Sequence, residues 1–500
     1  MKLIINEDNS HFYYQIAGKS IKGVDAFIDQ YENTGVTELF LNVNSMRASY
    51  DSKAFEPIWK GYDPTKGLDQ PYFDGVPENE RLSWNNWPYN ALELNGDGKN
   101  VYCDWIARCR EKKISPWISM RMNDVHCVDN EPHPINSDFW REHPEFRRVN
   151  YKPSLGWVEK AFDYGHKEVR EYHLNLIREF AELFDMDGLE LDWMRFGYCF
   201  KPGFEQEGAK LLNQFTRDVR KILDDAEQKR GHKIGLAARV PSRPATALNL
   251  GYDAVTWAIE GLIDLLVVTP FWATAETDMP IEIWKQLLRG TKTKLAAGIE
   301  VLLQAYSGAK HLFNGIETLR GTAWSYINRG VDAVYLFNYM HTGGEADGLA
   351  ESIDFNTEFT SRAGYDRVLN ETGDIEAMRG KCRRHVVTYA DTWAPGEPVA
   401  KLLPGWCDSG IWNAFRVHIG EAPNDASVVI SVDESPAVYV NGIKCEKSDF
   451  VVETIPVPPE KHHSYKIPVG VLHDGYNIVE TFGGKGSLIW VEIFVTEELN

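Results

Sequence analysis

The sequence predicts a (β/α)₈ TIM barrel followed by a C-terminal antiparallel β-sandwich of the jelly-roll type. Up to about residue 345, short apolar runs alternate with longer amphipathic stretches; beyond it, short strand-like runs are separated by Gly and Pro. Alternating strands and helices are typical of a parallel sheet with right-handed crossovers, and eight such units close into a barrel. We place the barrel at residues 1–380 and the sandwich at 381–500 of the 500-residue chain.

The barrel prediction depends on eight apolar, β-branched runs. They are residues 2–5, 37–43, 115–122, 187–193, 233–240, 264–271, 294–300 and 332–339. Between them, residues 23–35 and 167–184 have the spacing of amphipathic helices. An open, doubly wound sheet is the alternative, but no glycine-rich phosphate-binding loop follows any of these strands.

Two connections are long, at about 45–100 and 123–165, and both follow strand ends. They are rich in Trp, Tyr, Phe and Asn, so we expect ordered walls of a substrate cleft. Residues 373–385 are predicted to form a last helix. The sandwich strands are then expected at 386–393, 412–420, 426–433, 437–446, 465–470, 476–483 and 488–495.

Composition excludes several classes of partner. A formal net charge of −20 disfavours nucleic acid and anionic membranes. Seven scattered cysteines without a CxxC pair indicate neither a disulfide framework nor a zinc ribbon. The apolar run at the N-terminus is too short for the core of a signal peptide, and no apolar run in the sequence reaches membrane-spanning length. We expect a cytoplasmic protein, or a periplasmic or secreted one if a leader precedes this sequence; homo-oligomerisation stays open.

Polar side chains follow nearly every predicted strand, at the end where barrel enzymes build their sites. Carboxylates, amides, guanidinium groups and aromatic rings of this kind bind sugars. The predicted substrate-binding residues are Asn6, Asp8, Asn44, Arg47, Arg121, Asn123, His126, Glu190, Arg195, Arg239, Trp272, Asn338, Tyr339 and His341. No HxH pair, strand-end Lys or GxSxG elbow occurs, so we predict no metal, no cofactor, and neither Schiff-base nor serine-hydrolase chemistry.

Glycoside hydrolysis requires two carboxyl groups across the scissile bond. Asp192 and Glu300, from the fourth and seventh strands, are the predicted pair, with Asp124 in reserve as the acid. Period-two alternation also turns Glu190 inward, one layer deeper, where we expect it to pair with Arg121 or Arg239 or to tune its neighbour's pKa. Each of these acids could instead serve as a structural ion-pair partner, and which carboxylate is the acid stays open.

Residues 162–196, "FDYGHKEVREYHLNLIREFAELFDMDGLELDWMRF", resemble the segment that leads into the fourth strand of the glycoside-hydrolase-like barrel proteins found widely in bacteria. The matching positions are Asp163, His166, Val169, Arg170, Asp187, Gly188 and Asp192. "NDVH" (123–126) and "FWREHPEF" (139–146) resemble the same group. The resemblance covers about residues 1–345 and implies a barrel that acts on an oligosaccharide or glycoside, without naming the sugar.

The fourth strand also resembles the DxxDxDxE motif of chitinases, but Met194 stands where that family has its catalytic glutamate. Methionine cannot protonate a leaving group, so an acid must come from elsewhere. "AVYVNG" (437–442) and "IPVGVLHDGYNIVE" (467–480) resemble the jelly-roll accessory modules of glycosidases.

The leading hypothesis is therefore a glycoside hydrolase with a two-carboxylate mechanism. Met194 also motivates a non-catalytic, carbohydrate-binding relative with the same cleft. A third hypothesis is a polysaccharide lyase with Tyr339 or His126 as the base and an arginine that stabilises the enolate.

Overall fold

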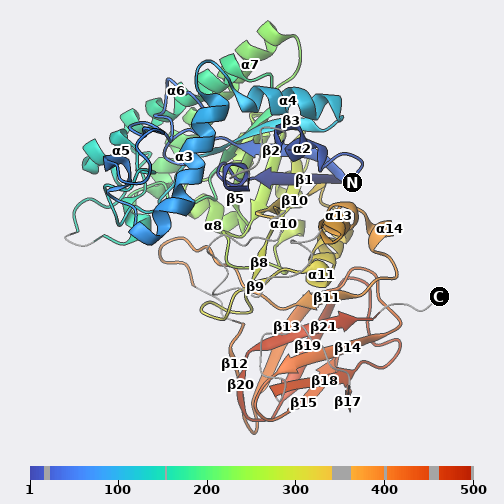
Figure 1. Cartoon of the computed structure of the whole chain (residues 1–500). Coiled ribbons are helices and arrows are strands. Elements are labelled where there is room, and N and C mark those ends of the chain that lie inside the picture. Colours follow the sequence, from blue (N-terminus) through green and yellow to red (C-terminus); the bar gives the residue numbers. More distant parts are fainter. Residues whose placement is uncertain (16–22, 153–154, 341–361, 399–401, 450–460, 497–500) are drawn as a thin grey trace.

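The computed structural model describes residues 1–15, 23–152, 155–340, 362–398, 402–449 and 461–496. Its larger part is a closed parallel barrel with strand order β1-β10-β7-β6-β5-β4-β3-β2 (Figure 1). The strands are β1 (Lys2–Glu7), β2 (Val36–Asn42), β3 (Ser115–Arg121), β4 (Gly188–Asp192), β5 (Gly235–Pro241), β6 (Leu265–Thr269), β7 (Lys294–Glu300) and β10 (Ala333–Phe337). Every strand lies within two residues of its predicted run, so the barrel prediction is confirmed.

Helices connect the barrel strands along the chain, and the last two, α13 and α14, follow β10 and precede the C-terminal sheets. They are α1 (His11–Gln15), α2 (Gly23–Asp29), α3 (Arg81–Asn95), α4 (Val101–Glu111), α5 (Asp138–Glu142), α6 (Lys167–Leu183), α7 (Glu205–Arg230), α8 (Pro244–Asn249), α9 (Ala254–Ile259), α10 (Ile281–Leu287), α11 (Ile316–Asn328), α13 (Arg362–Glu371) and α14 (Ile375–Met378). The predicted periodicity of α6 holds, because Val169, Leu176, Ile177 and Phe180 are buried along one face.

The end of the barrel at which the strands begin is filled with aromatic side chains. Trp117 stacks on Phe40 with ring centroids 4.9 Å apart. Two glycines make room for the indole, because a Cβ at Gly188 or Gly235 would lie 2.2 or 2.6 Å from a Trp117 ring atom. This end is a packed core, so polar side chains gather at the opposite, carboxyl end of the strands.

The C-terminal part consists of antiparallel sheets, as predicted. One sheet has the order β11-β21-β14-β18-β17, another has β13-β19-β15-β16, and β12 pairs with β20. The strands are β11 (Arg383–Val386), β12 (Gly405–Cys407), β13 (Trp412–His418), β14 (Ala426–Ser431), β15 (Ala437–Val440), β16 (Ile443–Lys444), β17 (Glu446–Ser448), β18 (His462–Lys466), β19 (Tyr476–Phe482), β20 (Gly486–Leu488) and β21 (Trp490–Val495).

The junction between the two parts differs from the prediction. The helix expected over 373–385 is wrong beyond α14, because Gly380 has φ +71° and Arg383 already begins β11, which pairs with β21. The strand expected over 386–393 is also wrong, since β11 ends at Val386. The barrel and β11 pack closely here: a Cβ on Gly321 of α11 would lie 1.9 Å from the carbonyl oxygen of Arg384.

A short hairpin follows the seventh barrel strand. It is formed by β8 (Leu302–Leu303) and β9 (Leu312–Phe313). Figure 1 shows this hairpin between the barrel and the sandwich. Among the described residues, no helix has both the length and the apolar character needed to cross a membrane.

Candidate active site

The carboxyl ends of the barrel strands hold two adjoining groups of polar side chains. The first, which we call the carboxylate cluster, consists of Asp192, Arg239 and Glu300. The second, the rim cluster, consists of Asp8, Arg121, Asp124, His126 and Arg195. Strand register builds both, because Arg121 lies opposite Asp192, which in turn lies opposite Arg239.

One guanidinium holds both carboxylates of the carboxylate cluster. Arg239 Nη1 donates to Asp192 Oδ1 and Oδ2 at 3.0 and 3.1 Å, and Nη2 donates to Glu300 Oε1 at 2.9 Å. The Arg239 guanidinium carbon lies 3.7 Å from the centroid of the Phe337 ring. All three side chains are buried. The structure therefore brings the predicted pair, Asp192 and Glu300, onto a shared cation.

The two carboxyl groups have unlike surroundings. Asp192 Oδ1 also accepts the backbone N–H groups of Met194 and Arg195, both at 3.0 Å. Glu300 Oε2, by contrast, has no hydrogen-bond partner among the described residues. Burial raises the pKa of Glu300 well above its usual value, against the opposing charges of Arg239 and Arg195. Asp192 is thus supplied with donors for its charge, while Glu300 is placed to keep a proton.

Glu190 lies one layer deeper, as the alternation of β4 predicts. Its Oε2 accepts from Ser119 Oγ at 2.6 Å, from Tyr335 OH at 3.1 Å and from Asn6 Nδ2 at 3.3 Å. Burial, and then the charge of Asp192, raises the pKa of Glu190 to about 8. We expected Glu190 to pair with Arg121 or Arg239, but its hydrogen-bond partners are two hydroxyls and an amide. A carboxyl group that keeps its proton carries no charge and needs no cation as a hydrogen-bond partner.

Ser119 and Tyr335 were not among the predicted site residues. Tyr335 alternates with Ala333 and Phe337, which all point into the barrel. The same period-two argument that placed Glu190 could therefore have found Tyr335.

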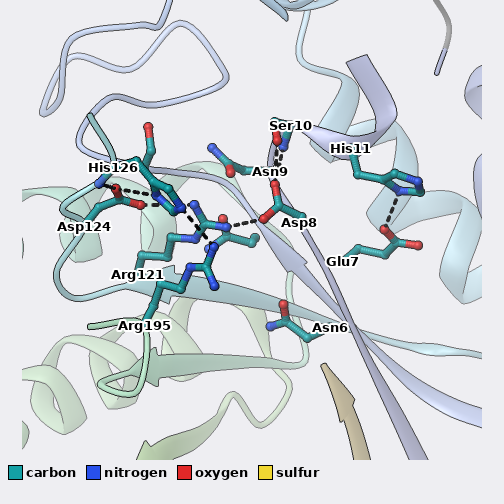
Figure 2. A network of polar contacts seen from close by, with 12 residues as sticks. Asn6, Glu7, Asp8, Asn9, Ser10, His11, Arg121, Asp124, His126 and Arg195 are labelled. Atoms are coloured by element: carbon teal, nitrogen blue, oxygen red, sulfur yellow. Dashed lines mark hydrogen bonds and ion pairs between the residues drawn. The ribbon is translucent and has the colours of Figure 1, made fainter. Parts of the chain in front are cut away.

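The rim cluster is organised around Arg121 (Figure 2). This guanidinium donates to Asp8 and, at 3.1 Å, to Asp124 Oδ2. Asp8 also accepts the backbone N–H and the hydroxyl of Ser10, at 2.8 and 2.7 Å. Burial disfavours the charge of Asp8, but Arg121 and Arg195 outweigh it and hold the pKa of Asp8 well below its usual value. Asp8 is thus an anion at any pH near neutrality.

His126 and Asp124 form a dyad at the exposed side of the rim cluster. Asp124 Oδ1 lies 2.8 Å from His126 Nδ1 and accepts the His126 backbone N–H at 2.9 Å. Arg195 Nη2 lies 3.2 Å from His126 Nε2. These partners assign the proton to Nδ1 and the acceptor role to Nε2. The His126 side chain is 38% exposed, so it is open to solvent.

Two predicted binding residues form hydrogen bonds from their side-chain amides to backbone groups. Asn44 accepts from the N–H of Arg121 at 3.2 Å and donates to its carbonyl at 3.1 Å. Asn123 makes the same pair of bonds to Phe162, at 3.0 and 3.1 Å. Both asparagines therefore fix the chain around the rim cluster.

Arg47 and Tyr339 likewise donate hydrogen bonds to backbone carbonyl groups. Arg47 donates to the carbonyl of Lys60 at 3.2 Å and to Asp138 Oδ1 at 3.5 Å, which ties the first long connection to α5. The buried hydroxyl of Tyr339 donates to the carbonyl of Glu300 at 3.0 Å. Tyr339 thus holds the end of β7, and its hydroxyl is not placed as a base.

The remaining predicted residues lie farther along the loops. Asn338 is half-buried after β10 with φ +60°. Trp272 is half-buried in the loop after β6, its ring 5.2 Å from that of His311. His341 lies outside the described residues. Among the described residues, no group of three or more His, Cys, Asp or Glu side chains is arranged to hold a metal ion.

No protein-family model matches the chain, and no curated protein matches it in sequence. Solved structures do resemble it. The cycloisomaltooligosaccharide glucanotransferase of a Paenibacillus species has a TM-score of 0.34 at 8% identity, over 99% of this chain and 57% of that one. The chitinase ChiW from Paenibacillus sp. FPU-7 has a TM-score of 0.42 at 11% identity, over 98% and 56%.

The α-L-fucosidase isoenzyme 1 from Paenibacillus thiaminolyticus has a TM-score of 0.35 at 11% identity, over 97% of this chain and 96% of that one. The chain spans just over half the length of the glucanotransferase and of ChiW. At these identities and TM-scores the likeness concerns the fold, and no activity of this chain follows from theirs. The subfamily is not identified.

Proposed function

We propose that this protein is a glycoside hydrolase in which Glu300 is the general acid and Asp192 is the nucleophile or general base. The observation that supports the proposal is the Arg239 guanidinium, which holds two carboxyl groups of unlike surroundings at the carboxyl ends of β4 and β7. Two carboxyl groups whose environments separate their protonation states are the usual basis for acid and base roles.

The roles follow from the surroundings of each group. Glu300 has one oxygen bound to Arg239 and the other without a partner among the described residues, which leaves that oxygen to protonate a glycosidic oxygen. The Asp192 carboxyl group accepts hydrogen bonds from a guanidinium and from two backbone N–H groups, surroundings that suit a nucleophile or a base. If Asp192 attacks the anomeric carbon, Glu300 first gives its proton to the leaving oxygen and then takes one proton from the water that hydrolyses the glycosyl–Asp192 bond, whose second proton stays on the new sugar hydroxyl. If Asp192 instead takes one proton from the attacking water, that proton passes through solvent to Glu300 after the products leave.

This assignment also supplies the acid that the fourth strand lacks. Met194, at the position of the chitinase glutamate, is buried and has no proton to give. The acid on β7 would take its place from a strand three positions away from β4 in the barrel order.

The test compares Glu300→Gln and Asp192→Asn on aryl glycosides of both anomers and on unsubstituted oligosaccharides. Loss of a general acid should cost about 10²- to 10⁴-fold in rate on oligosaccharides. The Glu300→Gln loss should shrink on dinitrophenyl glycosides, whose leaving group needs no proton, whereas the Asp192→Asn loss should not. Glu371→Gln, which removes a buried carboxylate paired with Arg320 outside the site, is the matched control and should stay active. Full activity of either site variant refutes the assignment.

The His126–Asp124 dyad favours a second candidate, a polysaccharide lyase. The His126 side chain is 38% exposed and its Nε2 lies 3.2 Å from Arg195 Nη2, so an imidazole that could remove a proton lies beside a guanidinium that could neutralise a uronate carboxylate. Such a reaction would give an unsaturated product with new ultraviolet absorbance on uronate polysaccharides, and His126→Ala would abolish it. Glycan binding without turnover of any kind would favour the non-catalytic alternative.

A further inference from the structure

A pocket lined by polar and aromatic side chains lies beside the carboxylate cluster, where the barrel meets the chain leading to the sandwich. Its volume is about 450 Å³, within the range of small-molecule sites. Four segments enclose it: the short 3-10 helix Trp157–Lys160, the loop after β6, the turn of the β8–β9 hairpin, and the residues that follow β11. Six rings line it, from Trp157, Phe271, Trp272, His311, Tyr389 and Trp393.

The walls of this pocket are fixed by hydrogen bonds. The carboxylate of Asp391 accepts the backbone N–H groups of Phe271, Trp272 and Ala273 at 2.7, 3.1 and 3.0 Å. The hydroxyl of Tyr389 donates to Gln304 Oε1 in the hairpin at 2.7 Å. The chain after β11 therefore holds both barrel loops, so the pocket is formed before any ligand arrives.

The rings are more exposed than a hydrophobic core requires. Trp157 is 42% exposed and stacks on Phe271 with ring centroids 6.3 Å apart and an interplanar angle of 24°. Trp272 and Trp393 are half-buried, whereas Trp140, Trp193, Trp257, Trp284 and Trp324 are fully buried elsewhere in the barrel. Flat rings with polar groups at their edges match a sugar unit, which has apolar C–H faces and a belt of hydroxyls.

The polar groups of the pocket complete this match. Burial lowers the pKa of His311, so the imidazole is neutral and offers one donor and one acceptor. Gln304 and Asp391 lie in the same lining. The pocket thus combines apolar faces with neutral hydrogen-bonding groups and one carboxylate, a composition that favours a neutral, polyhydroxylated ligand over an anion.

The pocket adjoins the candidate active site. Phe196, next to Arg195 of the rim cluster, contacts Trp157 and Phe271 with ring centroids 5.3 and 5.5 Å apart. Glu300 ends β7, directly before the hairpin that forms one wall. We propose that this pocket binds another sugar unit of the same oligosaccharide whose scissile bond lies at Asp192 and Glu300. The substrate is then an oligosaccharide or polysaccharide rather than a simple glycoside, an inference that rests on the proposed function.

The test measures binding apart from hydrolysis. Titration calorimetry with the full-length Glu300→Gln protein would use cello-, xylo-, manno-, chito-, malto- and laminari-hexaoses and the matching disaccharides. We expect at least one hexaose to bind, with Trp157→Ala weakening it at least tenfold and Trp157→Phe, which keeps a ring, weakening it less. Trp406→Ala, which removes a tryptophan 57% exposed on β12 and outside the pocket, is the matched control and should bind as before.

Each outcome decides one of the two proposals. Equal affinity of the parent and of Trp157→Ala for every hexaose, or no binding at all, overturns the sugar pocket. Hexaose binding that depends on Trp157 but is never accompanied by hydrolysis in the protein with Glu300 leaves the pocket standing and removes the proposed activity. Hydrolysis of a hexaose with a KM that Trp157→Ala does not change supports the proposed activity and overturns the sugar pocket.

Discussion

Replacing Arg239 with methionine should destabilise the barrel strongly. The substitution keeps an unbranched chain of similar length beside Phe337 but removes the cation between Asp192 and Glu300. Arg239 is 0% exposed, so water cannot take over its role. Asp192 would keep only its two backbone N–H donors, and Glu300 Oε1 would lose its guanidinium.

The expected loss follows from these contacts. Removing one partner of a buried ion pair typically costs about 3–5 kcal/mol, mostly because the remaining charge is left without compensation. Glu300 escapes part of this cost, since its raised pKa lets it bind a proton. We therefore expect the free energy of unfolding to fall by about 3 kcal/mol, at the lower end of that range.

The assay is urea-induced unfolding at neutral pH, followed by tryptophan fluorescence and far-ultraviolet circular dichroism. A double-mutant cycle isolates the charge effect: in an Asp192→Asn background the same Arg239→Met change should cost clearly less, about 1–2 kcal/mol. A loss under about 1 kcal/mol in the parent, or equal losses in the two backgrounds, would refute the reasoning that Asp192 depends on this cation.

Two other predictions concern the barrel interior. Because native Glu190 keeps its proton up to a pKa of about 8, and an unfolded glutamate loses it near 4.5, the native state binds more protons between these values. Glu190 therefore contributes a loss of stability as pH rises from 5 to 8, and Glu190→Gln should make the slope of stability against pH less negative by on the order of 1 kcal/mol per pH unit in urea unfolding; parallel slopes would contradict the raised pKa. Gly188→Ala should reduce the free energy of unfolding by about 3 kcal/mol and lower the melting temperature accordingly, because the new Cβ would lie 2.2 Å from the Trp117 ring. Trp117→Leu in the same chain should restore part of the loss, and an unchanged melting temperature of Gly188→Ala alone would show that the ring can move.

The prediction of the barrel succeeded because it depends on local patterns. Each strand is a short apolar run whose inward face follows from period-two alternation, and β7 begins and ends where predicted, at Lys294 and Glu300. The junction was predicted less well. Residues 373–385 have helical spacing, but pairing of Arg383 with Val495, more than a hundred residues later, makes the end of that segment a strand. Local spacing cannot register such a distant partner.

The sequence by itself determined that Glu190, Asp192 and Glu300 point into a barrel, because alternation and strand order fix the direction of a side chain. Only the tertiary structure decided which of them is supplied with donors for a charge. That depends on Arg239, Tyr335 and Ser119 from three other strands, and on a loss of water that no local pattern records. The aromatic pocket has the same origin, since Asp391 reaches its loop partners only through the path of the chain after β11. Direction is a local property of the chain, whereas protonation and pocket shape are properties of what surrounds it.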